Sequence, residues 1–238
     1  MSKKNINFIQ GSGFLAKAFK KKLAFFKKNV IILYVAGISN SLEKRNKEFK
    51  REFKRIEEFI KSNDKKIVYI STCSIFDNSR NHAYVKNKIK IEKLIRLKVK
   101  KYIIIRLPEL VGSNKNPNTL VNFFYNKITK KKKFNLWINA KRNLLDIEDV
   151  IKMTLYYVNI YKNKNKVMNL LNTKFYYASE ILENLEKITK KKALYNEKKV
   201  KSYKYKIKNE LNSRAIKKLN LKFNKSYLNH ILKKYYNR

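Results

Sequence analysis

Residues 6–19 read INFIQGSGFLAKAF: a short apolar strand, a Gly-Ser-Gly turn and the start of an amphipathic helix. A helix N-terminus carries unpaired N–H groups and the positive end of the helix dipole, which suits a pyrophosphate. Glycine lets the backbone approach that phosphate without a Cβ in the way. In a GxxGxxG pattern centred on Gly13, the outer positions hold Gln10 and Ala16. This stretch therefore predicts a strand–turn–helix unit suited to a diphosphate, with a degraded glycine pattern.

The alternation of strand and helix continues along the chain. Apolar runs of strand length are residues 5–10, 30–35, 66–71, 102–107, 134–139 and 167–171. Helical patterns are residues 14–26, 42–61, 84–97, 119–130, 147–161, 178–189 and 226–236. Short apolar strands alternating with amphipathic helices predict βαβ units and a parallel sheet buried on both faces. The predicted fold class is α/β, with a mostly helical region after Leu171.

The chain contains only four glycines, Gly11, Gly13, Gly37 and Gly112, and each follows soon after a predicted strand. In a doubly wound sheet, ligands bind at the carboxyl ends of the strands, where backbone approaches them closely. Glycine is also a common turn residue at strand exits. This feature alone does not separate a ligand-binding edge from ordinary turns.

Composition limits the class of protein. The 59 basic and 17 acidic residues give a net charge of +42, and lysine accounts for most of the basic residues. The excess of Lys, Asn, Ile, Tyr and Phe favours drift towards A+T-rich codons over a selected polyanion surface, although the field attracts anions either way. The single cysteine fits a reducing cytoplasm. Together with only two histidines it does not supply a His/Cys zinc site, so no metal is expected. The longest uncharged run, residues 29–42, is too short to span a bilayer, and we expect a soluble cytoplasmic protein.

A second group of polar residues follows the strand in KIVYISTCSIF, residues 66–76. Tyr84 and Lys88 stand four residues apart and so share one helix face. A nearby ammonium favours the phenolate and makes a tyrosine a usable acid or base, while the Thr72 hydroxyl could bind the substrate oxygen. Tyr195 and Lys199 have the same spacing without a preceding strand, and we interpret them as surface residues.

In this order, the motifs resemble those of the extended short-chain dehydrogenase/reductase family of nucleotide-sugar epimerases, dehydratases and reductases. GSGFLAKAF resembles the cofactor loop, YVAGISNS the exit of the fourth strand, and YISTCSIF with YVKNK the catalytic strand and helix. IIIRLPELVG resembles the strand that follows, and NAKRNLLDIEDV the arginine segment that meets the nucleotide diphosphate. VMNLL, SEILENLEKI and SRAIKKLNLKF resemble the C-terminal substrate region.

The resemblance implies roles for individual residues. Tyr84 would be the catalytic acid/base, Lys88 would hold the nicotinamide ribose, and Thr72 would bind the reacting oxygen. Arg142 would meet the substrate diphosphate. The cofactor-binding residues would be Gly11, Ser12, Gly13, Phe14, Leu15, Ala36, Gly37 and Pro108.

Departures from the family pattern are specific. The strand after the glycine turn resembles the family's fourth, so the second and third strands are missing and the N-terminal half of the Rossmann-like sheet is shortened. No carboxylate follows residues 30–35, because the first acidic residue is Glu43. Cys73 and Ser74 stand where family dehydratases carry Asp-Glu, which argues against water elimination. Glu109 stands where many members have asparagine.

We therefore expect residues 1–165 to form the cofactor domain, with 113–145 on the substrate side, and residues 166–238 a small C-terminal substrate region. The predicted function is that of an NAD- or NADP-dependent epimerase or ketoreductase acting on a nucleotide sugar. One alternative is a non-catalytic module that binds a nucleotide or a partner. A less favoured one is a basic nucleic-acid-binding protein. No membrane or specific nucleic-acid partner is expected, and a homodimer is left open.

Four other residues have simpler interpretations than a functional one. Cys73 with His82 as its base would make a nucleophile, but a lone cysteine at a strand end is more often a small core residue. Arg106, inside an apolar strand, is compatible with a paired structural arginine. We expect Trp137 in the core and His82 in a loop.

Overall fold

The computed structural model describes residues 7–76, 83–114, 116–199 and 212–237. His82 lies outside the described residues, as do the first two residues of the strand predicted over 5–10. The chain divides into two compact units. The first comprises Met1–Leu107 and Ile151–Asn169, and the second Pro108–Val150 and Leu170–Arg238.

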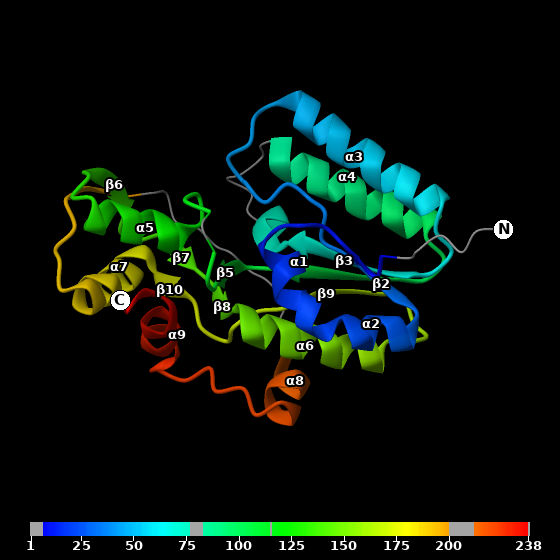
Figure 1. The fold of residues 1–238 in the computed structure, drawn as a ribbon. Helices are drawn as coiled ribbons and strands as arrows, with labels where there is room; N and C mark the ends of the chain where they lie inside the picture. Colours follow the sequence, from blue (N-terminus) through cyan, green and yellow to red (C-terminus); the bar gives the residue numbers. More distant parts are fainter. Residues whose placement is uncertain (1–6, 77–82, 115, 200–211, 238) are drawn as a thin grey trace. The chain divides into compact units, whose positions relative to one another are not determined.

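The first unit contains a parallel sheet of five strands in the order β1-β2-β3-β4-β9 (Figure 1). Its strands are β1 (Ile9–Gln10), β2 (Ile31–Tyr34), β3 (Lys66–Thr72), β4 (Tyr102–Leu107) and β9 (Lys166–Asn169). β9 corrects the expected boundary at residue 165, because it pairs with β4 and so belongs to this sheet. The register aligns Gln10 with Tyr34 and Tyr34 with Tyr69, so the strand exits lie along one edge.

Helices cover both faces of this sheet. α3 (Asn46–Lys61) and α4 (Ala83–Lys98) pack on the face that carries Tyr34, Tyr69 and Ile104, with Ile56 and Ile91 buried between. Figure 1 shows α1 (Phe14–Phe19), α2 (Leu23–Asn29) and α6 (Ile147–Ile160) on the opposite face. The predicted single helix over 14–26 is interrupted by a 3₁₀ turn at Lys20–Lys22.

β1 lies at the edge of the sheet, with β2 as its partner among the described residues. Two local hydrogen bonds occupy the groups that face away from β2. The amide of Ile9 donates to Asn7 Oδ1 at 3.2 Å, and Gln10 Nε2 donates to the Asn7 carbonyl at 2.8 Å. An edge whose backbone groups are used locally is a poor template for another strand. Within the described part of the chain, the sheet therefore ends at β1.

The connection from β1 to β2 has an unusual hand. The steps from β1 to β2 and from β2 to β3 run in the same direction across the sheet, but their helices lie on opposite faces (Figure 1). The two connections therefore have opposite hands, whereas about 98% of parallel crossovers are right-handed. In the doubly wound order 3-2-1-4-5-6, the first helix leads to strand 2, which lies on one side of strand 1, while strand 4 lies on the opposite side. The predicted absence of the second and third strands is thus confirmed, since residues 14–30 form only helices and a turn.

The described residues of the second unit form three small sheets and four helices. The pairs are β5 (Glu109–Val111) with β8 (Leu144–Asp146), β7 (Lys141–Arg142) with β10 (Tyr176–Tyr177), and β6 (Phe134–Trp137) with β11 (Tyr195–Lys198). The helices of its described part are α5 (Leu120–Thr129), α7 (Ala178–Thr189), α8 (Asn212–Lys218) and α9 (Tyr227–Tyr236). Side chains of α5, α7 and α9 bury an apolar core that includes Phe124, Leu185 and Ile231. Residues 113–145, expected on the substrate side, lie within this unit.

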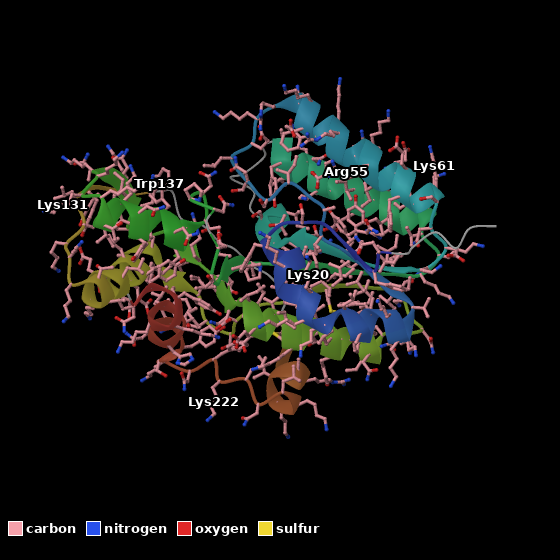
Figure 2. All side chains as sticks on the ribbon, in the orientation of Figure 1. Lys20, Arg55, Lys61, Lys131, Trp137 and Lys222 are labelled. Atoms are coloured by element: carbon pink, nitrogen blue, oxygen red, sulfur yellow. The ribbon has the colours of Figure 1, made fainter. Side chains whose placement is uncertain are left out.

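The exposure of Trp137, Tyr195 and the basic residues can be compared with what the sequence predicts. Trp137 is 51% exposed, so its expected place in the core is wrong: it lies on the outward side of β6, whose exposure alternates (Figure 2). Tyr195 is exposed on β11, as expected. The exposed basic residues labelled in Figure 2 come from both units. This spread favours compositional drift over a single selected patch as the origin of the charge.

Candidate active site

The glycine turn packs directly against the exit of β2. Gly11 has φ +140°, and a Cβ there would meet the carbonyl oxygen of Val35 at 2.9 Å and the amide of Ala36 at 3.1 Å. Only glycine fits this backbone without strain. Ser12 and Gly13 are exposed, and a Cβ on Gly13 would have no atom within 4 Å. The turn thus joins the two predicted cofactor loops while leaving open space at Gly13.

α1 begins at Phe14, directly after the turn. Phe14 and Leu15 are half-buried, whereas Ala16 and Phe19 face the core. The carbonyl of Gly13 accepts the amide of Lys17 at 3.0 Å, which closes the first helical turn. Residues Gly11–Leu15 therefore form one continuous strand–turn–helix segment, as the sequence predicts.

Thr72 ends β3 at the same edge. Its hydroxyl oxygen Oγ1 accepts the amide of Ser74 at 3.1 Å and lies 3.1 Å from Ser74 Oγ. Thr72 pairs in register with Leu107, the residue before Pro108. Pro108 begins the second unit, and its side chain is half-buried.

Tyr84 is the second residue of α4 and is 7% exposed. It forms a small apolar cluster with Phe49 of α3 and Val85. Ile75, three residues after Thr72, packs against the same cluster. The segments that carry Thr72 and Tyr84 are therefore neighbours in the first unit.

Lys88 lies one helical turn after Tyr84, with its ammonium 5.5 Å from the centre of the tyrosine ring. The ammonium forms a 2.6 Å ion pair with Glu52 of α3, and both side chains are only 4% exposed. Burial alone would lower the pKa of Lys88, but the hydroxyls of Tyr69 and Tyr84 and the Glu52 carboxylate together raise it above the ordinary value. Lys88 is therefore a cation across the physiological pH range.

Glu52 is the site residue that sequence reasoning missed. Its second carboxylate oxygen accepts the Asn87 amide at 2.8 Å. A signal was present, because Glu52 stands between Phe49 and Ile56 at spacings of three and four and so on the buried stripe of its helix. A carboxylate on such a stripe needs a buried partner.

A second, partly buried ion pair also belongs to the first unit. Arg106 Nη2 of β4 contacts Glu92 Oε2 of α4 at 2.6 Å, and Ser71 Oγ donates to Glu92 Oε1 at 2.6 Å. Arg106 is thus a paired structural arginine, the interpretation with which its place in an apolar strand is compatible. Cys73 is fully buried, and burial raises the pKa of its thiol. A thiol in this state is a poor nucleophile, which supports the core interpretation.

Arg142 lies in β7 of the second unit, opposite Tyr176 in the antiparallel pair with β10. Its side chain is half-buried, and Nη1 donates to the carbonyl of Lys141 at 2.9 Å. The fold thus brings together the glycine turn, Ala36, Gly37, Thr72, Tyr84 and Lys88 in the first unit, while Pro108 and Arg142 belong to the second.

No helix within the described ranges has the length and apolar character that a membrane crossing requires. Across those same ranges, no cluster of three His, Cys, Asp or Glu side chains is arranged to hold a metal ion.

Known proteins share this fold. The family model described as NAD dependent epimerase/dehydratase family matches residues 3–170. UDP-glucuronic acid 4-epimerase from Bacillus cereus, solved with UDP-glucuronic acid and NAD, superposes with a TM-score of 0.70 at 17% identity, covering 96% of this chain and 88% of that one. RMD from Pseudomonas aeruginosa, solved with NADPH, gives 0.65 at 14% identity, with coverage of 85% and 80%.

MoeE5, solved with UDP-glucuronic acid and NAD, gives a TM-score of 0.61 at 11% identity. This chain spans 66% of the length of MoeE5, just under two thirds. No curated protein matches the sequence significantly. At these identities the structural likeness establishes the Rossmann-like fold.

Proposed function

Because this chain belongs to the NAD dependent epimerase/dehydratase family, we propose that it is an NAD- or NADP-dependent enzyme that epimerises or reduces a nucleotide sugar. The observation that carries the proposal is the placement of Tyr84 and Lys88, 5.5 Å apart from ring centre to ammonium, on a helix beside the strand exits.

The glycine turn fits a dinucleotide diphosphate. Gly11 allows the turn to lie against Val35 and Ala36, and the space beside Gly13 is open. With the diphosphate bound there, the nicotinamide of the same dinucleotide would accept a hydride and return it. The described residues fit the adenosine half of the dinucleotide less well. Among them the sheet ends at β1, and no carboxylate precedes Glu43 to bind the adenosine ribose. We therefore expect weak discrimination between NAD and NADP.

The proposed chemistry is proton transfer at a sugar hydroxyl or carbonyl oxygen. Tyr84 Oη would take the proton from the hydroxyl as the sugar carbon is oxidised, and return it on reduction. Thr72 Oγ1 would hydrogen-bond the same oxygen and keep it oriented. Lys88, a permanent cation, would favour the phenolate form of Tyr84.

Substrate binding is assigned to the second unit. The guanidinium of Arg142 is suited to a nucleotide diphosphate, because a planar fork of donors matches phosphate oxygens. Pro108 would lie near the nicotinamide. A dehydratase is disfavoured, because Cys73 and Ser74 follow Thr72 in place of an acid pair and the Cys73 thiol is buried.

Thermal unfolding with NADH, NADPH and a panel of UDP- and dTDP-sugars tests the cofactor site, with a nucleotide-free polyanion as control. A ligand at about 100 times its Kd adds ~2.7 kcal/mol, or roughly 5–10 °C at this length. A shift with a dinucleotide and not with the polyanion supports the proposal. Equal shifts with every anion, or no shift at all, contradict it.

Tyr84→Phe tests catalysis itself, with sugar epimerisation or cofactor oxidation as the readout. Loss of a general acid/base lowers the rate by about 10²–10⁴-fold. The matched control is Tyr195→Phe, because Tyr195 has the same spacing to a lysine but is exposed on β11. Turnover that Tyr84→Phe retains in full would contradict the acid/base role of Tyr84, whereas absence of turnover in the wild type as well would favour the second candidate.

That second candidate is a non-catalytic module that binds a nucleotide or a partner. The sheet that ends at β1 favours it, because two strands of the adenosine side are missing. Such a module keeps dinucleotide or nucleotide binding when Tyr84 is replaced by phenylalanine, and it shows no turnover with any member of the panel.

A further inference from the structure

Glu52 lies beneath the loop that follows β2. Its Oε1 atom and the ammonium of Lys88 would each lie 2.7 Å from a Cβ placed on Gly37. Gly37 is exposed, whereas the ion pair below it is buried. The pair therefore lies directly under a loop that the proposed function assigns to the cofactor.

The carboxylate of Glu52 is held at both oxygens. Oε1 binds Lys88 at 2.6 Å, and Oε2 accepts from Asn87 at 2.8 Å. Asn87 and Lys88 are consecutive residues of α4, so one carboxylate fixes α3 to α4 next to Tyr84. Held in this way, the ammonium has little freedom to move.

The groups that face this pair come from four elements. Tyr84 and Lys88 belong to α4, Glu52 and Arg55 to α3, Tyr69 to β3 and Tyr34 to β2. The hydroxyls of Tyr34 and Tyr69 are buried without a hydrogen-bond partner among the described residues. Burial, above all, raises the pKa of both tyrosines, so both stay neutral at working pH. Lys88 is thus a charged neighbour of Tyr84, and Glu52 is the carboxylate paired with it.

We propose that Glu52 is a positioning residue: its carboxylate fixes the ammonium of Lys88 beneath Gly37 and partly balances its charge, which moderates the effect of that ammonium on Tyr84. The inference rests on the proposed function for the role of Tyr84. The ion pair itself does not depend on that role.

The proposal has a measurable electrostatic consequence. Glu52→Gln keeps the size and hydrogen-bonding shape of the side chain but removes its charge. The ammonium of Lys88 then acts on Tyr84 uncompensated and favours the phenolate. The midpoint for Tyr84 ionisation moves to lower pH by about one unit, within the range that a nearby opposite charge produces.

The titration is followed by NMR of protein labelled with ¹³Cζ-tyrosine, and Tyr84→Phe assigns the signal among the 16 tyrosines. Glu52→Asp retains the charge and is expected to keep the wild-type midpoint. The double variant Glu52→Gln/Lys88→Met removes both charges and restores the midpoint to near the wild-type value. It also keeps the test usable where Glu52→Gln alone does not fold, since a buried pair replaced as a whole is tolerated better than one broken.

Where Glu52→Gln folds, two results of the NMR titration overturn the proposal. One is a Glu52→Gln variant whose Tyr84 midpoint equals that of the wild type. The other is a double variant that titrates like Glu52→Gln, because the shift would then not come from Lys88. Where Glu52→Gln does not fold, a double variant whose midpoint differs from wild type by a unit or more also overturns it.

Activity provides a separate readout. For a nucleotide-sugar reaction, Glu52→Gln moves the acidic limb of the kcat/KM profile to lower pH, and Glu52→Asp restores it. Absence of turnover in the wild type counts against the proposed function alone, because the NMR titration needs no substrate. An acidic limb that stays in place in an active Glu52→Gln enzyme counts against the positioning role.

Discussion

Lys66, the first residue of β3, donates a 2.7 Å hydrogen bond from its ammonium to the carbonyl of Tyr161, just beyond the end of α6. The same ammonium reaches the carbonyls of Lys162 and Lys164 at 3.1 and 2.9 Å. A cation at the C-terminal end of a helix satisfies carbonyls that have no partner within the helix. This lysine thus ties α6 to the sheet of the first unit.

Lys66→Met is therefore expected to lower the free energy of unfolding by about 2–3 kcal/mol, because it removes the hydrogen bonds of a charged donor to three part-buried carbonyls. Urea unfolding followed by circular dichroism measures the change. Lys164→Met is the control, since its side chain is exposed in the same turn and it removes an equal charge. Equal stability of the two variants would show that the three carbonyls are satisfied in another way.

Tyr34→Phe is expected to leave stability unchanged or to raise it by up to about 1 kcal/mol. The Tyr34 hydroxyl is buried with no partner among the described residues, so the substitution removes an unsatisfied group and keeps the ring contact with Tyr69. Thermal unfolding at pH 7 measures this effect. A loss of more than 1 kcal/mol would mean that the hydroxyl has a bonding partner such as water.

The difference in stability between Tyr34→Phe and the wild type is expected to depend on pH in the alkaline range. Burial raises the pKa of Tyr34 from 10.0 to about 12, with Arg55 opposing this. As the pH rises, the unfolded chain loses the proton first, so the stability contributed by Tyr34 is complete below pH 10 and falls between pH 10 and 12. The stability of Tyr34→Phe relative to wild type should therefore rise over this interval. A difference that does not vary with pH contradicts the assignment.

Gly37→Ala and Gly13→Ala should separate folding from cofactor binding. A Cβ on Gly37 meets Glu52 and Lys88 at 2.7 Å, so this variant is expected to lose about 1–3 kcal/mol of stability through the displaced ion pair. A Cβ on Gly13 has no atom within 4 Å, so Gly13→Ala is expected to be as stable as wild type. Under the proposed function, Gly13→Ala also loses most of its stabilisation by NADH, because the new methyl group occupies the space for the diphosphate. Unchanged stabilisation would place the diphosphate elsewhere.

Tyr227→Phe is expected to loosen α9 in the second unit. The buried Tyr227 hydroxyl accepts the amide of Asp146 at 2.9 Å and donates to Asp149 Oδ2 at 2.8 Å. Its loss removes both hydrogen bonds and is expected to cost about 1–3 kcal/mol. Hydrogen exchange of the α9 amides should speed up more than that of α4, and equal changes in both helices would contradict a local role.

Much of the first unit could be predicted from local sequence. Tyr102–Leu107 forms a strand over the predicted residues, and Ala178–Thr189 a helix over the predicted residues. Both patterns are complete within one segment, since apolar spacing decides strand or helix locally. The two-residue strands β7 and β10 could not be predicted, because each exists only through its partner. For the same reason, a boundary at residue 165 cut off β9, whose membership of the sheet depends on β4.

In the candidate site, the sequence by itself determined which residue types stand at the strand exits: the glycine turn, Thr72, and Tyr84 with Lys88. It did so because each lies within a few residues of a recognisable strand or helix. Tertiary structure alone decided that Lys88 pairs with Glu52, that Lys66 reaches the end of α6, and that β1 joins the sheet through a crossover of reversed hand. In each case the partners are distant in the chain. They meet only when the helices pack on the sheet, because a charge or carbonyl that packing removes from water must then be paired.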